Sequence, residues 1–282
     1  MSAVTATMIK ELRERTGIGM GKCKEALEEA HGDMELAIAN LRKSGMLSAA
    51  KKEGRETKEG MIGAASNNQR IALVEISAET DFVVKNDRFK QFLETIAAEI
   101  AATNPNSLES FMNQRYSQDS ELTIDQYRAT VVQAIGENIQ IKRLLVVPKT
   151  ANHSYGVYSH LGGKIVVIID IEGSDKEEEL AKNIALHTAA AAPEYLAPEK
   201  VPAHILEQEK EIARAQVKDK PAQIIDKIVE GKIKSFNEMN CLLFQKYIKD
   251  DKLTIKEVVD QQGKASGRPL TIVNFWRWTT GR

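Results

Sequence analysis

The residue types best suited to chemistry or recognition come together at Thr80-Asp81-Phe82-Val83, where a carboxylate adjoins a large aromatic side chain. The segment follows an apolar run, Arg70 to Ile76, that is typical of a strand. Two interpretations fit these residues. In one, Asp81 closes a turn while Phe82, Val83 and Val84 return to the core, as most apolar side chains do. In the other, Asp81 and Phe82 form a tip that enters a partner, because aromatic anchors carry much of the energy at interfaces.

Catalytic motifs are absent from the sequence. It contains no phosphate-binding loop, dinucleotide fingerprint, nucleophile elbow or His-Glu-x-x-His pair. The two cysteines, Cys23 and Cys241, lie far apart without a Cys-x-x-Cys partner, which argues against a disulfide framework or a zinc site. The five histidines, which stand at no ligand spacing, are His31, His153, His160, His187 and His204. The sequence therefore predicts a binding protein without cofactor, metal or catalytic residues, rather than an enzyme.

Composition narrows the choice of partners. A chain of 282 residues with 42% hydrophobic and 28% charged residues is typical of a globular protein with two or three modules. A formal net charge of −1 removes the broad attraction that nucleic-acid binders use, so we expect no nucleic-acid partner. No apolar run approaches the ~18 residues of a membrane span, so no membrane contact is expected. The N-terminus lacks the pattern of a secretory signal, and we expect a cytoplasmic protein.

Residues 5–43 carry three short helical patterns, with apolar residues at three- and four-residue spacing. We assign them to an N-terminal domain at 1-45, followed at 46-60 by a charged linker that is helical or flexible. Between the first two helices, Ile18 and Met20 flank a glycine in a turn where side chains have little core to enter. We therefore expect this loop to be exposed and to dock a partner.

A pattern of strand hairpin, connection and helix occurs twice in the rest of the chain. Corresponding strand residues, Ile71 and Ile165, differ by 94 positions, whereas the helix residues Ile96 and Ile184 differ by 88. The connection is therefore six residues longer in the first copy, and the extra residues include 80–83. Long connections often hold functional residues, so the comparison favours the partner-binding interpretation of this segment.

These patterns predict an α+β protein: a small three-helix head, then a duplicated core of antiparallel sheets and helices. The core subdomains cover 61-150 and 151-282. Within the second, residues 199-236 contain two amphipathic helices joined at Lys218-Asp219-Lys220-Pro221, which we expect to project as a coiled-coil hairpin. The sequence leaves open whether two copies of the chain dimerise through the core or through this hairpin.

Two segments resemble the signatures of the elongation factor Ts family: Leu12 to Met20, continuing from Cys23 to Leu27, and Thr80 to Val83. The similarity spans nearly the whole chain, including the Gly136-Glu137-Asn138 turn. The resemblance implies a translation elongation factor with a UBA-like head. It also implies a guanine nucleotide exchange factor, without covalent chemistry of its own, that binds the GTPase elongation factor Tu in its GDP-bound and nucleotide-free forms.

The resemblance further implies residue roles. The tip around Asp81 and Phe82 would insert near the Mg²⁺ and nucleotide site of elongation factor Tu, so that GDP leaves and GTP rebinds. The residues implied in partner contact are Thr80, Asp81, Phe82 and Val83 in the core, Arg13, Ile18 and Met20 in the head, and Tyr158 and His160 in the second repeat. Two other classes stay open: an adaptor that binds through the head alone, and an unrecognised hydrolase.

Overall fold

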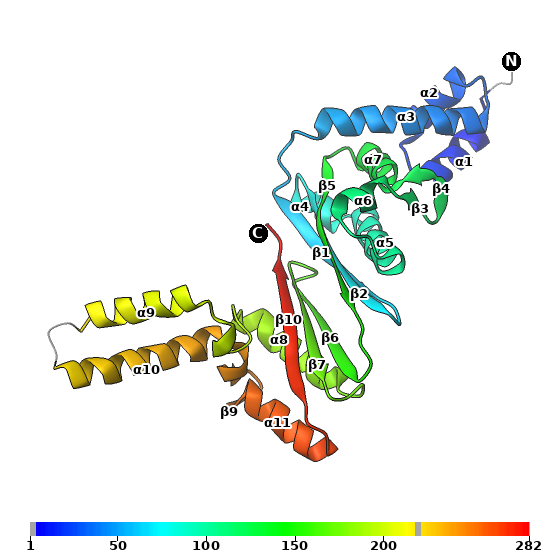
Figure 1. The fold of residues 1–282 in the computed structure, drawn as a ribbon. Helices are drawn as coiled ribbons and strands as arrows, with labels where there is room; N and C mark the ends of the chain where they lie inside the picture. The colour runs from blue at the N-terminus through cyan, green and yellow to red at the C-terminus, as the bar shows by residue number, and fades with distance from the viewer. Residues whose placement is uncertain (1–3, 218–220, 282) are drawn as a thin grey trace. The chain divides into compact units, whose positions relative to one another are not determined.

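The structure, a computed structural model, describes residues 4–217 and 221–281 (Figure 1). The chain forms two compact units: unit 1 contains Met1–Pro148 with Thr279–Arg282, and unit 2 contains Lys149–Trp278. Each unit combines helices with antiparallel strands, which confirms the predicted α+β class. Within the described ranges, no helix is long and apolar enough to cross a membrane.

Unit 1 begins with the head, three helices that share a small apolar core. They are α1 (Ala6–Thr16), α2 (Met20–Glu29) and α3 (Met34–Lys52). Thr5 and Asp33 cap α1 and α3, because their side chains accept hydrogen bonds from main-chain N–H groups in the first turn. Helix α3 continues to Lys52, so the first part of the predicted linker at 46–60 is helical. The similarity of this head to UBA domains stays a prediction.

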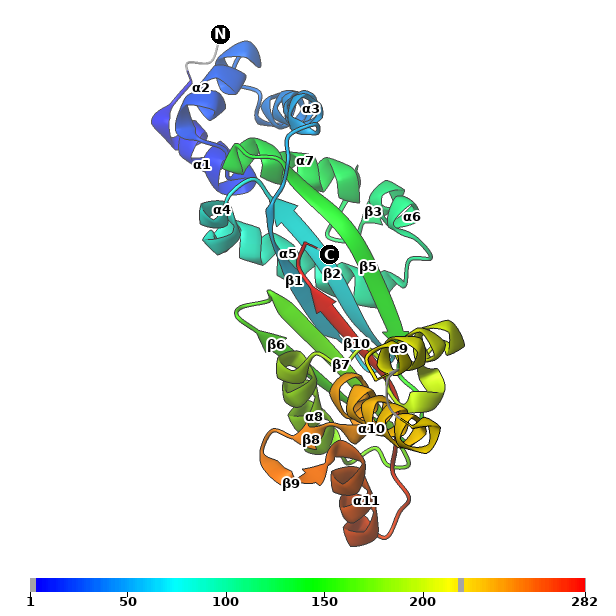
Figure 2. The same cartoon turned by 90° about the vertical axis from the view of Figure 1, so that its left-hand side faces the viewer.

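The rest of unit 1 is built on an antiparallel sheet with the strand order β1-β2-β5 (Figure 2). The strands are β1 (Glu59–Ser66), β2 (Arg70–Ala78) and β5 (Ile139–Pro148). The central strand β2 is buried along nearly its whole length, and helix α5 (Asp87–Thr103) packs Phe89, Phe92 and Ile96 into the same core. Gly63 of β1 lets this helix approach closely, because a Cβ atom there would lie 2.8 Å from the Leu93 side chain.

Five further elements complete unit 1. They are α4 (Asp81–Lys85), α6 (Leu108–Asn113), β3 (Arg115–Tyr116), β4 (Asp119–Thr123) and α7 (Ile124–Ile135). Helix α4 lies in the connection between β2 and α5, at the segment that the repeat comparison identified as extra. Helix α7 packs against α3 of the head and is followed by Gly136, which has a φ of 95°.

Unit 2 repeats this arrangement with the strand order β10-β7-β6. Its sheet consists of β6 (His153–His160), β7 (Ile165–Glu172) and β10 (Thr271–Thr279), and α8 (Glu178–Ala191) packs on it. The remaining elements are η1 (Pro198–Lys200), α9 (Ala203–Ala215), α10 (Ala222–Asn240), η2 (Leu242–Phe244), β8 (Lys246–Tyr247), β9 (Asp250–Thr254) and α11 (Ile255–Ser266). Helices α9 and α10 pack on each other as the predicted hairpin, while the turn residues Lys218-Asp219-Lys220 lie outside the described ranges.

The structure confirms both sequence offsets of the repeat. Strands β2 and β7 end at Ala78 and Glu172, which are 94 positions apart. Helices α5 and α8 are followed by left-handed residues, Asn104 (φ 52°) and Ala192 (φ 47°), which are 88 positions apart. The additional helix α4 therefore belongs to the first copy alone.

The repeat also extends further than the sequence patterns indicated. The small hairpins β3–β4 and β8–β9, with the helices α7 and α11 that follow them, match at an offset of 131 positions, from Arg115 and Lys246 to Gly136 and Gly267. Both helices start with a capping box on a threonine, and both are followed by a left-handed glycine. The strands were missed because they are short and polar and lack an apolar alternation.

Candidate partner-binding site

Phe82 is exposed over 82% of its surface, more than any other large apolar side chain in the described ranges. Its neighbours Val83 and Val84 are 8% and 5% exposed and belong to the core of unit 1. Each of the two interpretations, return to the core or exposure as a tip, therefore holds for part of this segment. Phe82 points away from the core as a tip would, whereas Val83 anchors the segment from below.

The tip is formed by α4, a helix of five residues. Thr80 caps it, since its hydroxyl accepts a hydrogen bond from the Val83 N–H at 3.4 Å. Asp81 forms an ion pair with Lys85 one turn later, at 2.7 Å, and this contact holds the pKa of the Asp81 carboxyl below its ordinary value. A helix this short is not stable alone, so its orientation has to come from contacts with the body of unit 1.

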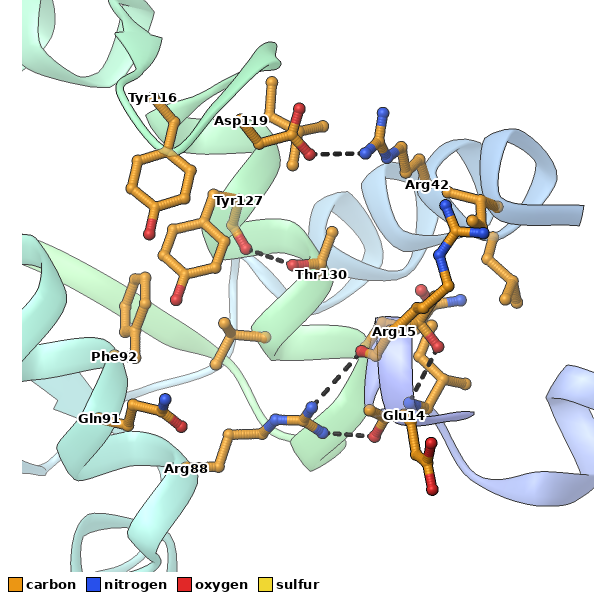
Figure 3. A pocket seen from close by; sticks show the side chains of 18 residues that line it. Glu14, Arg15, Arg42, Arg88, Gln91, Phe92, Tyr116, Asp119, Tyr127 and Thr130 are labelled. Carbon is orange, nitrogen blue, oxygen red and sulfur yellow. Dashed lines mark hydrogen bonds and ion pairs between the residues drawn. The ribbon is translucent and has the colours of Figure 1, made fainter. Parts of the chain in front are cut away.

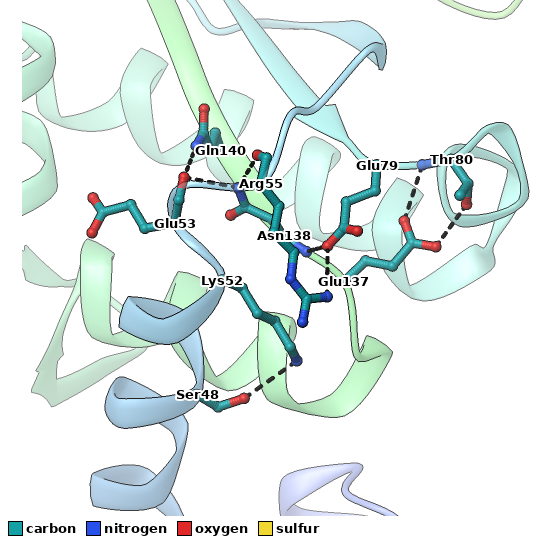
Figure 4. Close-up of polar contacts among 9 residues, drawn as sticks. All are labelled: Ser48, Lys52, Glu53, Arg55, Glu79, Thr80, Glu137, Asn138 and Gln140. Carbon is teal, nitrogen blue, oxygen red and sulfur yellow. Dashed lines mark hydrogen bonds and ion pairs between the residues drawn. The ribbon is translucent and has the colours of Figure 1, made fainter.

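Glu137 supplies the main contact (Figure 4). The Thr80 N–H donates to one Glu137 oxygen at 3.0 Å, and the Thr80 hydroxyl donates to the other at 2.7 Å. One threonine thus uses its hydroxyl both as donor and as acceptor, joining α4 to the turn after α7. Hydrogen bonds to a carboxylate are stronger than neutral ones, so this two-point contact fixes the base of the tip.

A second set of contacts holds the same turn from the other side. A Glu79 oxygen accepts from the Asn138 N–H at 2.6 Å and from the Arg55 guanidinium at 3.4 Å. Asn138 is fully buried, and its side-chain amide donates to the carbonyls of Glu53 (3.2 Å) and Arg55 (2.9 Å), as Figure 4 shows. At the level of sequence, the Gly136-Glu137-Asn138 turn stood out only through the family resemblance, and Glu137 had no role. The only signal in the sequence was an acidic residue directly after a glycine at the end of the predicted helix.

Beside Phe82 lies a shallow depression at the end of α7. Its lining residues are Phe82, Val83, Asn86, Arg88, Ala134 and Ile135. Ala134 also packs against the apolar core of the head. The tip therefore borders the helix on which the head rests.

In the head, the expectation that Ile18 is exposed is wrong. Ile18 is 2% exposed and packs with Leu12, Cys23 and Leu27. The backbone explains this: Gly17 takes a left-handed conformation, and the Ile18 N–H donates to the Thr16 hydroxyl at 3.3 Å, while the Cys23 thiol donates to the Ile18 carbonyl at 3.3 Å. The sequence pattern did not reveal that the junction of the three helices has room for this side chain.

The other predicted contact residues of the head lie on its surface. Arg13 is exposed on α1, and Met20 is 57% exposed at the start of α2. In unit 2, Tyr158 and His160 are on the same face of β6, and the Tyr158 hydroxyl and the His160 Nδ1 lie 3.2 Å apart. The His160 side chain is exposed, and Tyr158 is half-buried.

The described residues contain no group of three or more His, Cys, Asp or Glu side chains that could hold a metal ion. An exposed aromatic side chain on a clamped turn is instead an arrangement suited to binding another protein. Fold and site together define a duplicated α+β core that presents an exposed aromatic tip, as protein-binding factors do.

Comparison with known proteins specifies the family. The family model described as Elongation factor TS matches residues 79–282. Elongation factor Ts of Protochlamydia amoebophila is 64% identical over 282 residues, which cover 100% of both chains. The same factor from Chlamydia muridarum is 44% identical and that from Chlamydia trachomatis serovar L2 is 42% identical, each over 281 residues and 100% of both chains. The chain belongs to the elongation factor Ts family, and it is thus a translation elongation factor acting in protein biosynthesis.

Proposed function

We propose that the chain binds the GTPase elongation factor Tu in the cytoplasm and promotes the release of GDP, so that GTP can bind in its place. The tip of Asp81 and Phe82 acts near the Mg²⁺ and nucleotide site of that GTPase. No covalent step takes place on this chain and no cofactor takes part. The observation that carries the proposal is the exposure of Phe82 on a turn that Glu137 holds at two points.

The energetic argument starts from Phe82. Transferring a fully exposed phenylalanine side chain into an apolar pocket contributes about 2–3 kcal/mol. Because Thr80 and Glu137 hold α4 before binding, little conformational entropy is lost when the partner closes on the tip. The binding energy is therefore available to shift the conformation of the GTPase.

Release of GDP follows from coupling between two ligands of one protein. Suppose the tip binds better to a GTPase conformation with a displaced Mg²⁺ site. Binding of the tip then lowers the affinity of the GTPase for GDP, and bound GDP lowers its affinity for the tip by the same factor. Mg²⁺ requires near-ideal octahedral coordination, so a small displacement of its supporting residues is sufficient. The exchange factor need not touch the nucleotide.

The other contact residues have separate parts in this proposal. Met20 and Arg13 contact the partner directly from the surface of the head. Ile18 contributes by packing inside the head and shaping the loop that presents Met20. Val83 anchors the tip from the core. Thr80 orients it.

Unit 2 offers two further surfaces. Tyr158 and His160 on β6 contact a second region of elongation factor Tu. The helical hairpin leaves Ile212 and Ile224 more than 40% exposed, at 44% and 46%. Dimerisation through this hairpin, or through the core, stays a prediction.

The decisive measurement is stopped-flow release of labelled GDP from elongation factor Tu with Phe82→Ala. We expect the stimulated release rate to fall by a factor that corresponds to about 2 kcal/mol or more, with unchanged thermal unfolding of the free chain. Ile248→Ala is the matched control, because Ile248 is an apolar residue with 54% exposure between β8 and β9, outside the proposed contacts. Equal release by wild type and Phe82→Ala would contradict the proposal. If Met20→Ala abolished binding while Phe82→Ala had no effect, the adaptor function would be favoured.

A further inference from the structure

Arg88 connects the head to the segment that carries the tip. It lies in the first turn of α5, six positions after Phe82. Its guanidinium donates to the carbonyl oxygens of Gly17 and of Thr16, the latter at 3.4 Å (Figure 3). These carbonyls lie at the C-terminal end of α1, where the helix dipole favours a cation.

The contact requires glycine at position 17. Gly17 has a φ of 66°, and a Cβ atom there would lie 1.2 Å from the Arg88 Nη2. Gly17 also ends α1 through its N–H, which donates to the Arg13 carbonyl at 2.6 Å. The guanidinium therefore occupies the space that a side chain at this position would take, directly before the loop that leads to Met20.

On its other side, Arg88 borders the tip. It lines the depression beside Phe82 together with Asn86 and Ala134. Asn86 ends α4 and caps α5 by accepting a hydrogen bond from the Arg88 N–H at 2.9 Å. One residue thus has main-chain contact with the base of the tip and side-chain contact with the head loop.

We infer that Arg88 is a positioning residue that holds the head loop Thr16–Met20 and the tip Asp81–Phe82 in one fixed arrangement, so that both engage the same partner as a single interface. The inference rests on the proposed function. When two contact segments are held rigidly, binding of the first makes binding of the second intramolecular, which raises the overall affinity. Arginine suits the role, because its planar fork serves two carbonyl oxygens at once, whereas lysine acts from one point.

Other contacts keep the head folded and attached when Arg88 is replaced. Arg42 of α3 forms an ion pair with Asp119 at 2.6 Å, and the Gln133 amide of α7 donates to the Ser44 hydroxyl at 3.3 Å. Helices α3 and α7 also pack directly on each other. Loss of the Arg88 contact should therefore release the end of α1 and its loop, not the whole head.

The first test uses hydrogen exchange of the free full-length protein. We expect Arg88→Met to speed exchange of the Gly17 and Ile18 amides on the order of tenfold, and Arg88→Lys to have a smaller effect. Arg70→Met is the matched control, because Arg70 also donates to a main-chain carbonyl at a helix end, that of Ala101 at 3.4 Å, but does so at the far end of α5. Unchanged exchange of Gly17 and Ile18 in Arg88→Met would overturn the inference.

The second test measures affinity for GDP-loaded elongation factor Tu in a double-mutant cycle of Met20→Ala and Arg88→Met. If Arg88 couples the two segments, the loss from Met20→Ala should be about tenfold smaller in the Arg88→Met background than in the wild type. If Met20→Ala lowers the affinity equally in both backgrounds, the inference about Arg88 is overturned while the proposed function stands. A wild-type chain that neither binds the GTPase nor speeds GDP release overturns the proposed function as well, so the two failures are distinguishable.

Discussion

Replacing Thr80 by valine should release α4 from the body of unit 1 without unfolding the unit. Valine keeps the branching of threonine but lacks the hydroxyl that accepts from Val83 and donates to Glu137. Loss of an N-cap costs about 1 kcal/mol, and loss of a hydrogen bond to a carboxylate costs about 1.5–3 kcal/mol. Thr80 and Glu137 are both partly exposed, so water replaces part of these contacts, and we expect a local cost of about 2 kcal/mol.

This cost should appear in hydrogen exchange at the tip. A loss of about 2 kcal/mol raises the opening equilibrium about 30-fold. The Val83 and Val84 amides, which donate to the side chain and to the carbonyl of Thr80, should exchange faster by that factor. Amides of the buried strand β2 should keep their protection. Stimulated GDP release should fall too, because Phe82 is no longer held in its binding orientation.

Glu137→Gln provides the control for this reasoning. Glutamine keeps one acceptor oxygen but loses the charge and the second acceptor, so it should weaken both bonds from Thr80. If the two residues act together, the effect of Glu137→Gln should be smaller in the Thr80→Val background by about 1 kcal/mol. Additive effects, or unchanged exchange at Val83 in either variant, would refute the idea that Glu137 positions the tip.

Two further predictions concern stability. His187 is buried in unit 2, where its Nδ1 accepts a hydrogen bond from the Ile248 N–H, and burial lowers the pKa of the imidazole. In the unfolded chain the imidazole has a pKa of about 6.5 and therefore binds protons more readily than in the folded protein. The free energy of unfolding should consequently fall as the pH drops below that value. Urea unfolding at pH 8 and pH 5 should show this loss in the wild type, and a loss of the same size in His187→Gln would contradict it. Arg143→Met should destabilise unit 1 by about 3 kcal/mol, because it leaves the buried Glu75 carboxylate without the cation 2.7 Å away. Lys142→Met, at the exposed neighbouring position, is the control in the same urea titration. Equal unfolding midpoints for the two variants would show that leaving the Glu75 carboxylate without its cation does not destabilise unit 1.

The positions of the main helices and strands could be predicted from the sequence because their signals are local. Phe89, Phe92 and Ile96 mark one face of α5 by their spacing alone, and the run from Arg70 to Ile76 marks β2. The six-residue difference between the repeats located the extra segment with Phe82 from residue spacing alone. Where an element was short and polar, as in β3 and β4, no period existed to be detected.

The contacts that make the segment a site join residues far apart in the chain, and only the tertiary structure decides them. Glu137 reaches Thr80 across 57 positions, and Arg88 reaches Gly17 across 71. Neither pair leaves a periodic signal, since each depends on where two packed elements end. The same reason explains Ile18, whose burial depends on the junction of three helices. The sequence by itself determined which segment carries an aromatic tip, because residue spacing and the repeat depend only on the order of residues along the chain. The packing of α4, α7 and the head determined which way that tip points and which residues hold it.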